Sequence, residues 1–153
     1  MQTLLEIGPE HTAIVTRDGA DAPVHLMLQL GTARIARSHF RHAPPTPAEL
    51  EDAIQVVEDE LASAHRVIKG DSMLVTKDTA IRELARAAGV SPNPTLSLSR
   101  DAVEAAFNRM VARSSGQPAE RDGLPSDAQF TAALLILREL THHLGFVSIA
   151  VLG

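Results

Sequence analysis

The fold is decided by the opening stretch Leu4-Leu5-Glu6-Ile7-Gly8-Pro9-Glu10-His11-Thr12-Ala13-Ile14-Val15-Thr16-Arg17-Asp18-Gly19. Apolar and β-branched residues fill two short runs, and each run ends in a pair of turn formers, Gly8-Pro9 or Asp18-Gly19. The stretch therefore predicts a strand, a tight turn and a second strand.

The segment Val24–Leu30 alternates cleanly and predicts a third strand, with Val24, Leu26, Leu28 and Leu30 on one face. Together with strands at 3–7 and 12–17, it forms an antiparallel meander. The following segment, Thr32–Arg41, alternates poorly, and we expect a further strand there.

Helices and single strands share the rest of the chain. Thr46, Pro47 and Glu49 form a capping box, which predicts a helix to about Arg66 with a buried stripe. We expect further helices from residue 78 or 79 to Gly89, from Ser99 to about 113, and from Ser126 to 144. Strands are expected at 72–76, 95–98 and 146–152, the last one internal to the sheet. Residues 1–153 thus predict one α/β (or α+β) domain, with a mixed sheet, an N-terminal antiparallel meander and about four helices.

Composition narrows the function classes. The chain has 153 residues, no cysteine and a net charge of −5, which excludes thiolate chemistry and disulfides and disfavours nucleic acid as a partner. The longest apolar run, Ala132 to Leu137, is far shorter than the ~20 residues of a membrane span, so no membrane is expected. The N-terminus does not resemble a signal peptide, and we expect a cytoplasmic protein.

Three segments resemble the actin-like ATPase superfamily, and more narrowly a shortened exopolyphosphatase/GppA phosphatase domain. Leu5-Glu6-Ile7-Gly8 stands where that family has a strand ending in Asp-Ile-Gly. Residues 74–83 are similar to its strand-to-helix segment with Thr, Ala and Arg-Glu. Residues 120–149 are similar in layout to its loop, long helix and following strand.

The resemblance implies a phosphate-binding scaffold with incomplete chemistry. Its anion site would use the turn Gly8–His11 and the helix start at Thr79 and Arg82, so the candidate ligand-binding residues are Gly8, His11, Thr79 and Arg82. The family's first-strand Asp is Glu6 here, the turn has no hydroxyl residue, and the glycine-rich second phosphate motif is absent. These departures favour a non-catalytic relative.

Other residue patterns in the sequence give weaker evidence for a function. Residues 81–91 resemble the first helix and turn of a helix-turn-helix repressor, but Pro94 would fall inside the recognition helix. Arg109, Arg113 and Arg121 bracket a loop and could bind an anion, although arginines usually serve solubility. Glu139 precedes His142 by three residues and His143 by four, so one pair could share a helix face. Helix-end capping is the default for such histidines, and no metal site is expected.

Two hypotheses follow from the sequence. The first is a non-catalytic, self-associating interaction protein, a homodimer, because the final helix and strand are strongly apolar and no catalytic set is complete. The second is a small phosphate- or nucleotide-binding protein or phosphatase-like enzyme of actin-like ancestry. The sequence identifies no cofactor, ligand or substrate.

Overall fold

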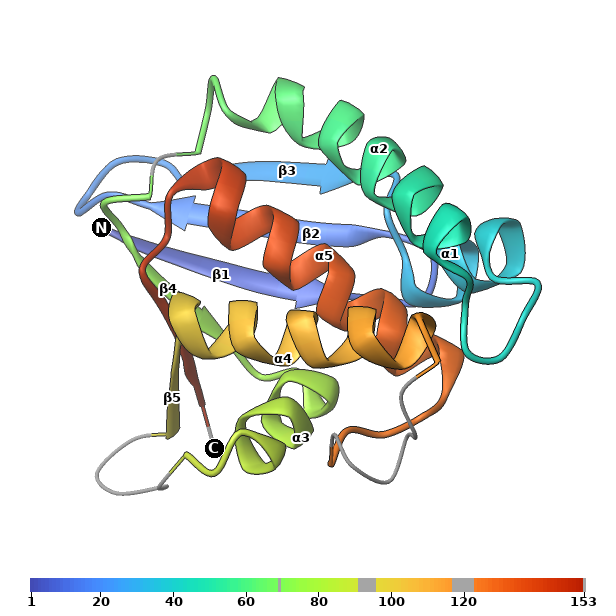
Figure 1. Cartoon of the computed structure of the whole chain (residues 1–153). Coiled ribbons are helices and arrows are strands. Elements are labelled where there is room, and N and C mark those ends of the chain that lie inside the picture. Colours follow the sequence, from blue (N-terminus) through green and yellow to red (C-terminus); the bar gives the residue numbers. More distant parts are fainter. Residues whose placement is uncertain (69, 91–95, 117–122, 153) are drawn as a thin grey trace.

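The computed structural model describes residues 1–68, 70–90, 96–116 and 123–152, and places them in one mixed sheet with a helical layer packed on it (Figure 1). The sheet has six strands in the order β3-β2-β1-β4-β6-β5. Their bounds are β1 Gln2–Ile7, β2 Thr12–Arg17, β3 Val24–Leu28, β4 Met73–Thr76, β5 Leu96–Ser99 and β6 Ser148–Val151. The predicted fold class, a mixed α/β sheet that begins with a meander, is confirmed.

The meander forms where the sequence alternates. β1 and β2 pair antiparallel with Leu5 opposite Ile14, and β2 and β3 pair antiparallel with Ile14 opposite Leu26. β4 then pairs parallel with β1, and β6 pairs parallel with β4. The last strand is therefore internal, as predicted, because β5 lies on its other side.

Five helices lie in the described part of the chain: α1 Thr32–His39, α2 Pro47–Ala64, α3 Thr79–Ala87, α4 Arg100–Ser114 and α5 Ala128–Leu144. The predicted caps of α2 and α4 are present, since Thr46 Oγ1 accepts from Glu49 N and Ser99 Oγ accepts from Ala102 N. Helix α5 contacts each of the other four helices (Figure 1). The apolar surface of α5 is therefore buried inside the molecule.

The segment from Thr32 was predicted to be a strand, and this prediction is wrong. It forms α1, which buries Thr32 and Ile35 on one face and exposes Arg37. The helix begins without a capping side chain. Its first N–H groups are instead satisfied by the turn between β1 and β2, since Thr32 N donates to Gly8 O at 3.0 Å and Ala33 N donates to Pro9 O at 2.9 Å.

Smaller differences concern the ends of elements. Helix α5 is capped by Asp127, whose Oδ2 accepts from Phe130 N, and not by Ser126. Strand β3 ends at Leu28, although Leu30 beyond it is fully buried. The loop that Arg109, Arg113 and Arg121 were expected to bracket includes residues 117–122, which lie outside the described residues.

The two faces of the sheet differ. Leu5, Ile14 and Leu28 point to the helical layer and are buried. Leu4, Met27 and Met73 lie on the opposite face, which we call the open face, and their side chains are 37%, 59% and 63% exposed. Exposure alternates along each strand because successive side chains of a strand point to opposite faces of the sheet.

Among the described residues, none of the helices has the length and apolar character that crossing a bilayer requires.

Candidate functional site

Two parallel strands end together at one edge of the sheet. β1 ends at Ile7 and β4 ends at Thr76, and Ile7 N donates to Asp78 Oδ2 at 2.7 Å. Glu6 and Lys77 are exposed beside this bond. A shallow hollow of about 190 Å³ lies here, lined by Leu4, Leu5, Glu6, Lys77 and Asp78. The carboxyl ends of parallel strands are a common position for ligand sites in α/β sheets.

Asp78 is the N-cap residue of α3, but its carboxylate does not cap that helix. One oxygen accepts from Ile7 N, while the backbone N–H of Asp78 donates to Thr76 Oγ1 at 3.1 Å. The first N–H groups of α3 therefore receive no bond from the N-cap side chain, and such groups attract anions.

Burial raises the pKa of the Asp78 carboxyl, the bond from Ile7 N opposes this change, and the nearby charge of Glu6 raises the pKa further. Glu6 and Asp78 are oxygen donors of the type that hard divalent cations prefer. Chemically, the edge combines an uncapped helix start for an anion with two carboxyl groups that could hold a cation beside it.

The predicted residues Gly8 and His11 are brought together by the turn itself. Gly8 N donates to His11 O at 2.9 Å, and Gly8 O and Pro9 O accept from the start of α1. A side chain at Gly31 would collide with this turn, because a Cβ there would lie 2.3 Å from Pro9 O. The turn is thus packed tightly against α1, and its binding of a ligand stays a prediction.

The other two predicted residues lie on the first turns of α3. Thr79 is its first residue and is exposed. Arg82 is half-buried, and its guanidinium donates to the carbonyl of Leu152, just after β6. The bond between Ile7 and Asp78 brings the turn and the start of α3 next to each other, so the structure joins both halves of the predicted site.

Sequence reasoning missed Lys77 and Asp78. Their position directly after a buried strand and before a helix was a usable signal, since that is where side chains reach the edge of a parallel sheet. The parallel partner of β4 could not be read from the sequence, however, so nothing indicated that Asp78 would reach Ile7.

The structure also shows what became of the helix-turn-helix resemblance and of the arginines near the loop. Helix α3 is followed by the strand β5, so the described residues hold no recognition helix at that position. Arg113 is buried, and its guanidinium donates to Leu124 O at 2.9 Å and Pro125 O at 3.0 Å. It anchors the chain that leads into α5, whereas Arg121 lies outside the described residues.

Solved structures with the same fold belong to exopolyphosphatases and related phosphatases. The type II variant of the Aquifex aeolicus Ppx/GppA phosphatase superimposes with a TM-score of 0.77 and 19% sequence identity, over 98% of this chain and 52% of that one. An exopolyphosphatase from Cytophaga hutchinsonii gives a TM-score of 0.72 and 14% identity, over 99% of this chain and 52% of that one. The actin-like fold suggested by the sequence is confirmed.

The likeness is one of fold. No sequence-family model and no curated protein matches the chain. The chain also spans about half the length of the solved structures it matches.

Proposed function

We propose that this chain binds a phosphate-containing anion at the carboxyl ends of β1 and β4, beside the start of α3, and does not hydrolyse it. The observation that carries the proposal is the start of α3. There the N-cap carboxylate is bonded to Ile7 N, and the first N–H groups of α3 receive no bond from the N-cap side chain. Lys77 adds a positive charge to the same rim.

Two further facts support a phosphate compound as ligand. The solved structures of this fold are described as exopolyphosphatases and phosphatases. The bond from Ile7 N to Asp78 also joins the strand before the Gly8 turn to the residue before Thr79, so two of the candidate residues are next to this bond in sequence. Binding without turnover is proposed because the turn carries Pro9 and Glu10 in place of hydroxyl residues.

Thermal melting of the full chain tests this proposal, with pyrophosphate, polyphosphate and ATP as probes, each with and without Mg²⁺. A ligand at 100 times its Kd should raise the Tm by about 5–10 °C for a domain of this size. The same probes should release no inorganic phosphate. A panel without any Tm rise contradicts the binding, and steady phosphate release contradicts the absence of turnover.

The sharpest variant is Lys77→Ala, because Lys77 is exposed and its replacement should leave the fold intact. It should weaken the Tm rise, whereas Arg86→Ala, an exposed cation at the far end of α3, should not. Gly8→Val and Arg82→Ala are poorer tests. A Cβ at Gly8 would lie 2.9 Å from His11 O, and Arg82 holds the carbonyl of Leu152, so both changes disturb the fold.

Self-association is a second candidate function, and the open face favours it. Leu4, Met27 and Met73 expose apolar side chains there, and Leu4 borders a hollow of about 330 Å³ that Arg17 and His25 also line. Exposed apolar surface is a common feature of protein contact surfaces. We propose a homodimer through this face, in place of the earlier interpretation that used the final helix.

Sedimentation equilibrium tests the dimer. The wild-type chain should associate, and Met27→Glu combined with Met73→Glu should give a monomer that keeps its helical circular dichroism. Val111→Glu is the control, because Val111 is exposed on α4 in the helical layer. A wild-type monomer at high concentration contradicts this candidate.

The cytoplasm remains the proposed location. A chain of 153 residues without cysteine has no need of an oxidising compartment.

A further inference from the structure

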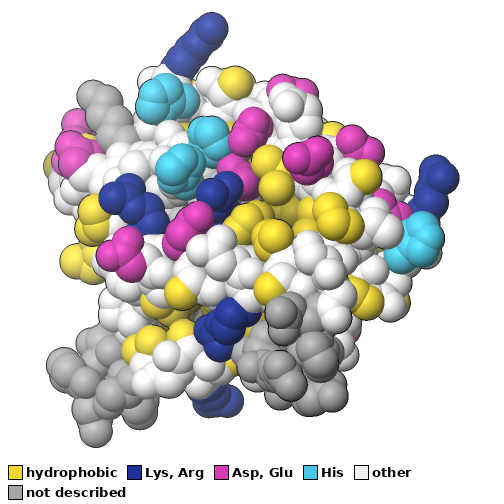
Figure 2. Space-filling model, in the orientation of Figure 1, with side chains coloured by type: hydrophobic (Ala, Val, Ile, Leu, Met, Phe, Trp, Pro, Cys, Tyr) yellow, Lys and Arg dark blue, Asp and Glu magenta, His cyan; other side chains and the backbone are white. Residues whose placement is uncertain are grey.

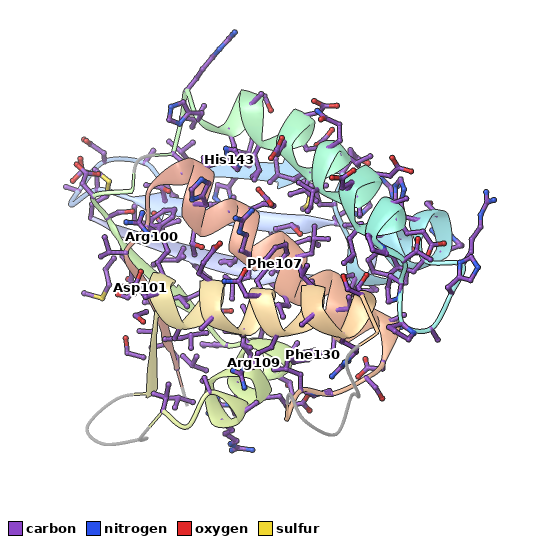
Figure 3. The ribbon with its side chains drawn as sticks, viewed as in Figure 1. Arg100, Asp101, Phe107, Arg109, Phe130 and His143 are labelled. Carbon is purple, nitrogen blue, oxygen red and sulfur yellow. The ribbon has the colours of Figure 1, made fainter. Side chains whose placement is uncertain are left out.

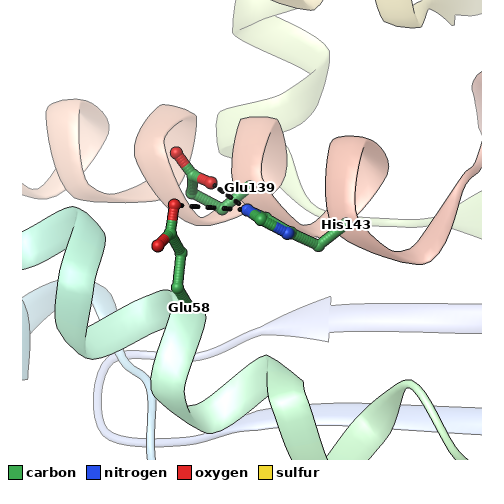
Figure 4. Close-up of side chains that lie close together, drawn as sticks. All are labelled: Glu58, Glu139 and His143. Carbon is green, nitrogen blue, oxygen red and sulfur yellow. Dashed lines mark hydrogen bonds and ion pairs between the residues drawn. The ribbon is translucent and has the colours of Figure 1, made fainter.

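A second polar cluster lies in the helical layer, away from the strand edge. It joins Glu58 of α2 with Glu139 and His143 of α5 (Figure 4). Nε2 of His143 is 3.0 Å from Oε2 of Glu139 and 3.3 Å from Oε1 of Glu58. One potential ligand atom from each residue lies within 4.8 Å of the other two. Histidine and acidic side chains gather on this face of the molecule (Figure 2).

Glu139 is fully buried, which is unusual for a carboxylate. Its Oε1 accepts from Arg138 Nη1 at 2.6 Å. Arg138 is itself held in place by two bonds of 2.9 Å to Glu104, and its guanidinium lies 4.6 Å from the ring centre of Phe107. Figure 3 labels Phe107 on α4 and His143 on α5. This support fixes the Glu139 carboxylate with its second oxygen, Oε2, aimed into the cluster.

That second oxygen is the unexplained feature. Oε2 of Glu139 is buried and accepts no hydrogen bond among the described residues; its contact is the 3.0 Å ion pair with Nε2 of His143, which needs a protonated imidazole. A buried carboxylate oxygen that accepts no hydrogen bond is costly. The imidazole cannot satisfy the cluster, because Nε2 carries at most one hydrogen and two carboxylates face it.

The donor set suits a metal ion. Glu139 and His143 are four residues apart, so they lie on the same face of α5, and Glu58 completes the group from α2. One imidazole nitrogen with two carboxylate oxygens matches zinc and related divalent transition metals, whereas Ca²⁺ and Mg²⁺ prefer oxygen ligands alone. A carboxylate ligand held by an outer arginine is also typical of metal sites.

We propose that Glu58, Glu139 and His143 bind a divalent transition-metal ion of the zinc class. The proposal is separate from phosphate binding at the strand edge, and it departs from the expectation of no metal site. Two of the three ligands, Glu58 and His143, line a surface pocket of about 320 Å³ together with Leu61, Ala62 and His65, which gives room for a water ligand on the metal. His65 lies on the wall of that pocket as a further imidazole.

Titration of the tag-free full chain with Co²⁺ and Zn²⁺ tests the site. We expect one ion per chain, with a Kd of about 1 µM or tighter, and visible Co²⁺ absorption of a four- or five-coordinate site. Excess Mg²⁺ should not displace the ion. His143→Ala should weaken binding at least about tenfold, and Glu58→Gln should also weaken it without loss of fold, because Glu58 is partly exposed.

Matched controls come from the same two helices. His142→Ala removes the neighbouring exposed imidazole, and Glu51→Gln removes an exposed carboxylate of α2. Both variants should bind as the wild type does. The proposal is overturned if the wild type binds no metal up to a concentration of about 100 µM, which is 100 times the expected Kd. An equal loss in His142→Ala and His143→Ala also overturns it, since it would show nonspecific histidine binding.

Discussion

Glu49 closes the start of α2 with both of its carboxylate oxygens. Oε1 accepts from Thr46 N at 2.9 Å, and Oε2 accepts from Arg41 N at 2.9 Å and contacts His42 Nδ1 at 3.1 Å. These bonds lower the pKa of Glu49 from 4.5 to about 2, the largest contribution coming from Thr46 N. A single side chain thus joins the helix start to the segment that precedes it.

The lowered pKa predicts how stability depends on pH. Because the native pKa of Glu49 lies below that of the unfolded chain, its ionised form stabilises the fold above about pH 4.5, and this contribution is lost as the pH falls to about 2. Urea unfolding of the wild type and of Glu49→Gln should therefore differ at pH 7 and converge towards pH 2. Glu51→Gln, an exposed neighbour, should show no such convergence. A constant difference for Glu49→Gln would contradict this assignment.

Arg113 is the second residue whose role is visible only in the folded chain. Its buried guanidinium donates to two backbone carbonyls, at Leu124 and Pro125. Arg113→Ala should lower the free energy of unfolding by about 2–4 kcal/mol, because two hydrogen bonds from a charged donor are lost, one of them to the buried Leu124. Chemical denaturation measures the loss. Arg86→Ala, at an exposed position, should change the same quantity by less than about 0.5 kcal/mol, and an equal effect of the two would refute the role.

At the scale of elements, α5 organises the molecule. It packs against α1, α2, α3 and α4, and most of its side chains are buried. Its apolar sequence suggested a homodimer interface, whereas in the structure most of its side chains are buried within the chain. A change in α5 should therefore act on folding and not on association.

A substitution of Leu137, which has no exposed surface, tests the role of α5 in the core. Leu137→Ala should reduce the free energy of unfolding by about 2–5 kcal/mol, since it removes buried methyl groups and leaves a cavity. Val147→Ala is the control, because Val147 is 67% exposed and its truncation should cost little. Urea unfolding followed by circular dichroism compares the two variants. A variant at Leu137 that changed the oligomeric state at unchanged stability would return α5 to the role of an interface.

Elements with local signals were predictable, and those specified by distant contacts were not. The three strands of the meander and α2 carry their own alternation, turn residues and capping box, so the sequence is sufficient for them. Helix α1 carries no capping side chain, because Gly31 precedes it and the carbonyls of Gly8 and Pro9 take its N–H groups. Nothing near Thr32 in the sequence indicates this bond pattern.

In the candidate site, too, local groupings were predictable from the sequence and distant contacts were not. Gly8 and His11 could be grouped because a tight turn keeps them close, and Thr79 with Arg82 because a helix start does. The approach of these two groups depends on the parallel pairing of β1 with β4, which joins residues about 70 positions apart. The metal-ligand cluster likewise needs α2 packed on α5 before Glu58 can meet His143.

At the scale of the whole molecule, the described residues are tied together by contacts that cross the chain. β1 lies between β2 and β4, and α5 reaches back to α1 and α2. The N-terminal meander therefore completes its sheet and its core only with residues from the second half of the chain. The fold is built as one unit, although it spans half the length of the solved structures it matches.

This interdependence predicts a single cooperative unfolding transition. In differential scanning calorimetry, the calorimetric and van't Hoff enthalpies of the 153-residue chain should agree, as they do for one-domain proteins of this size. The fragment 1–68 should show no stable helix or sheet by circular dichroism, because β1 loses its partner β4 and α2 loses its partner α5. Mixing it with the fragment 69–153 should restore part of the signal. A fragment 1–68 that melts cooperatively by itself would divide the chain into two folding units and would contradict the assignment of one domain to residues 1–153.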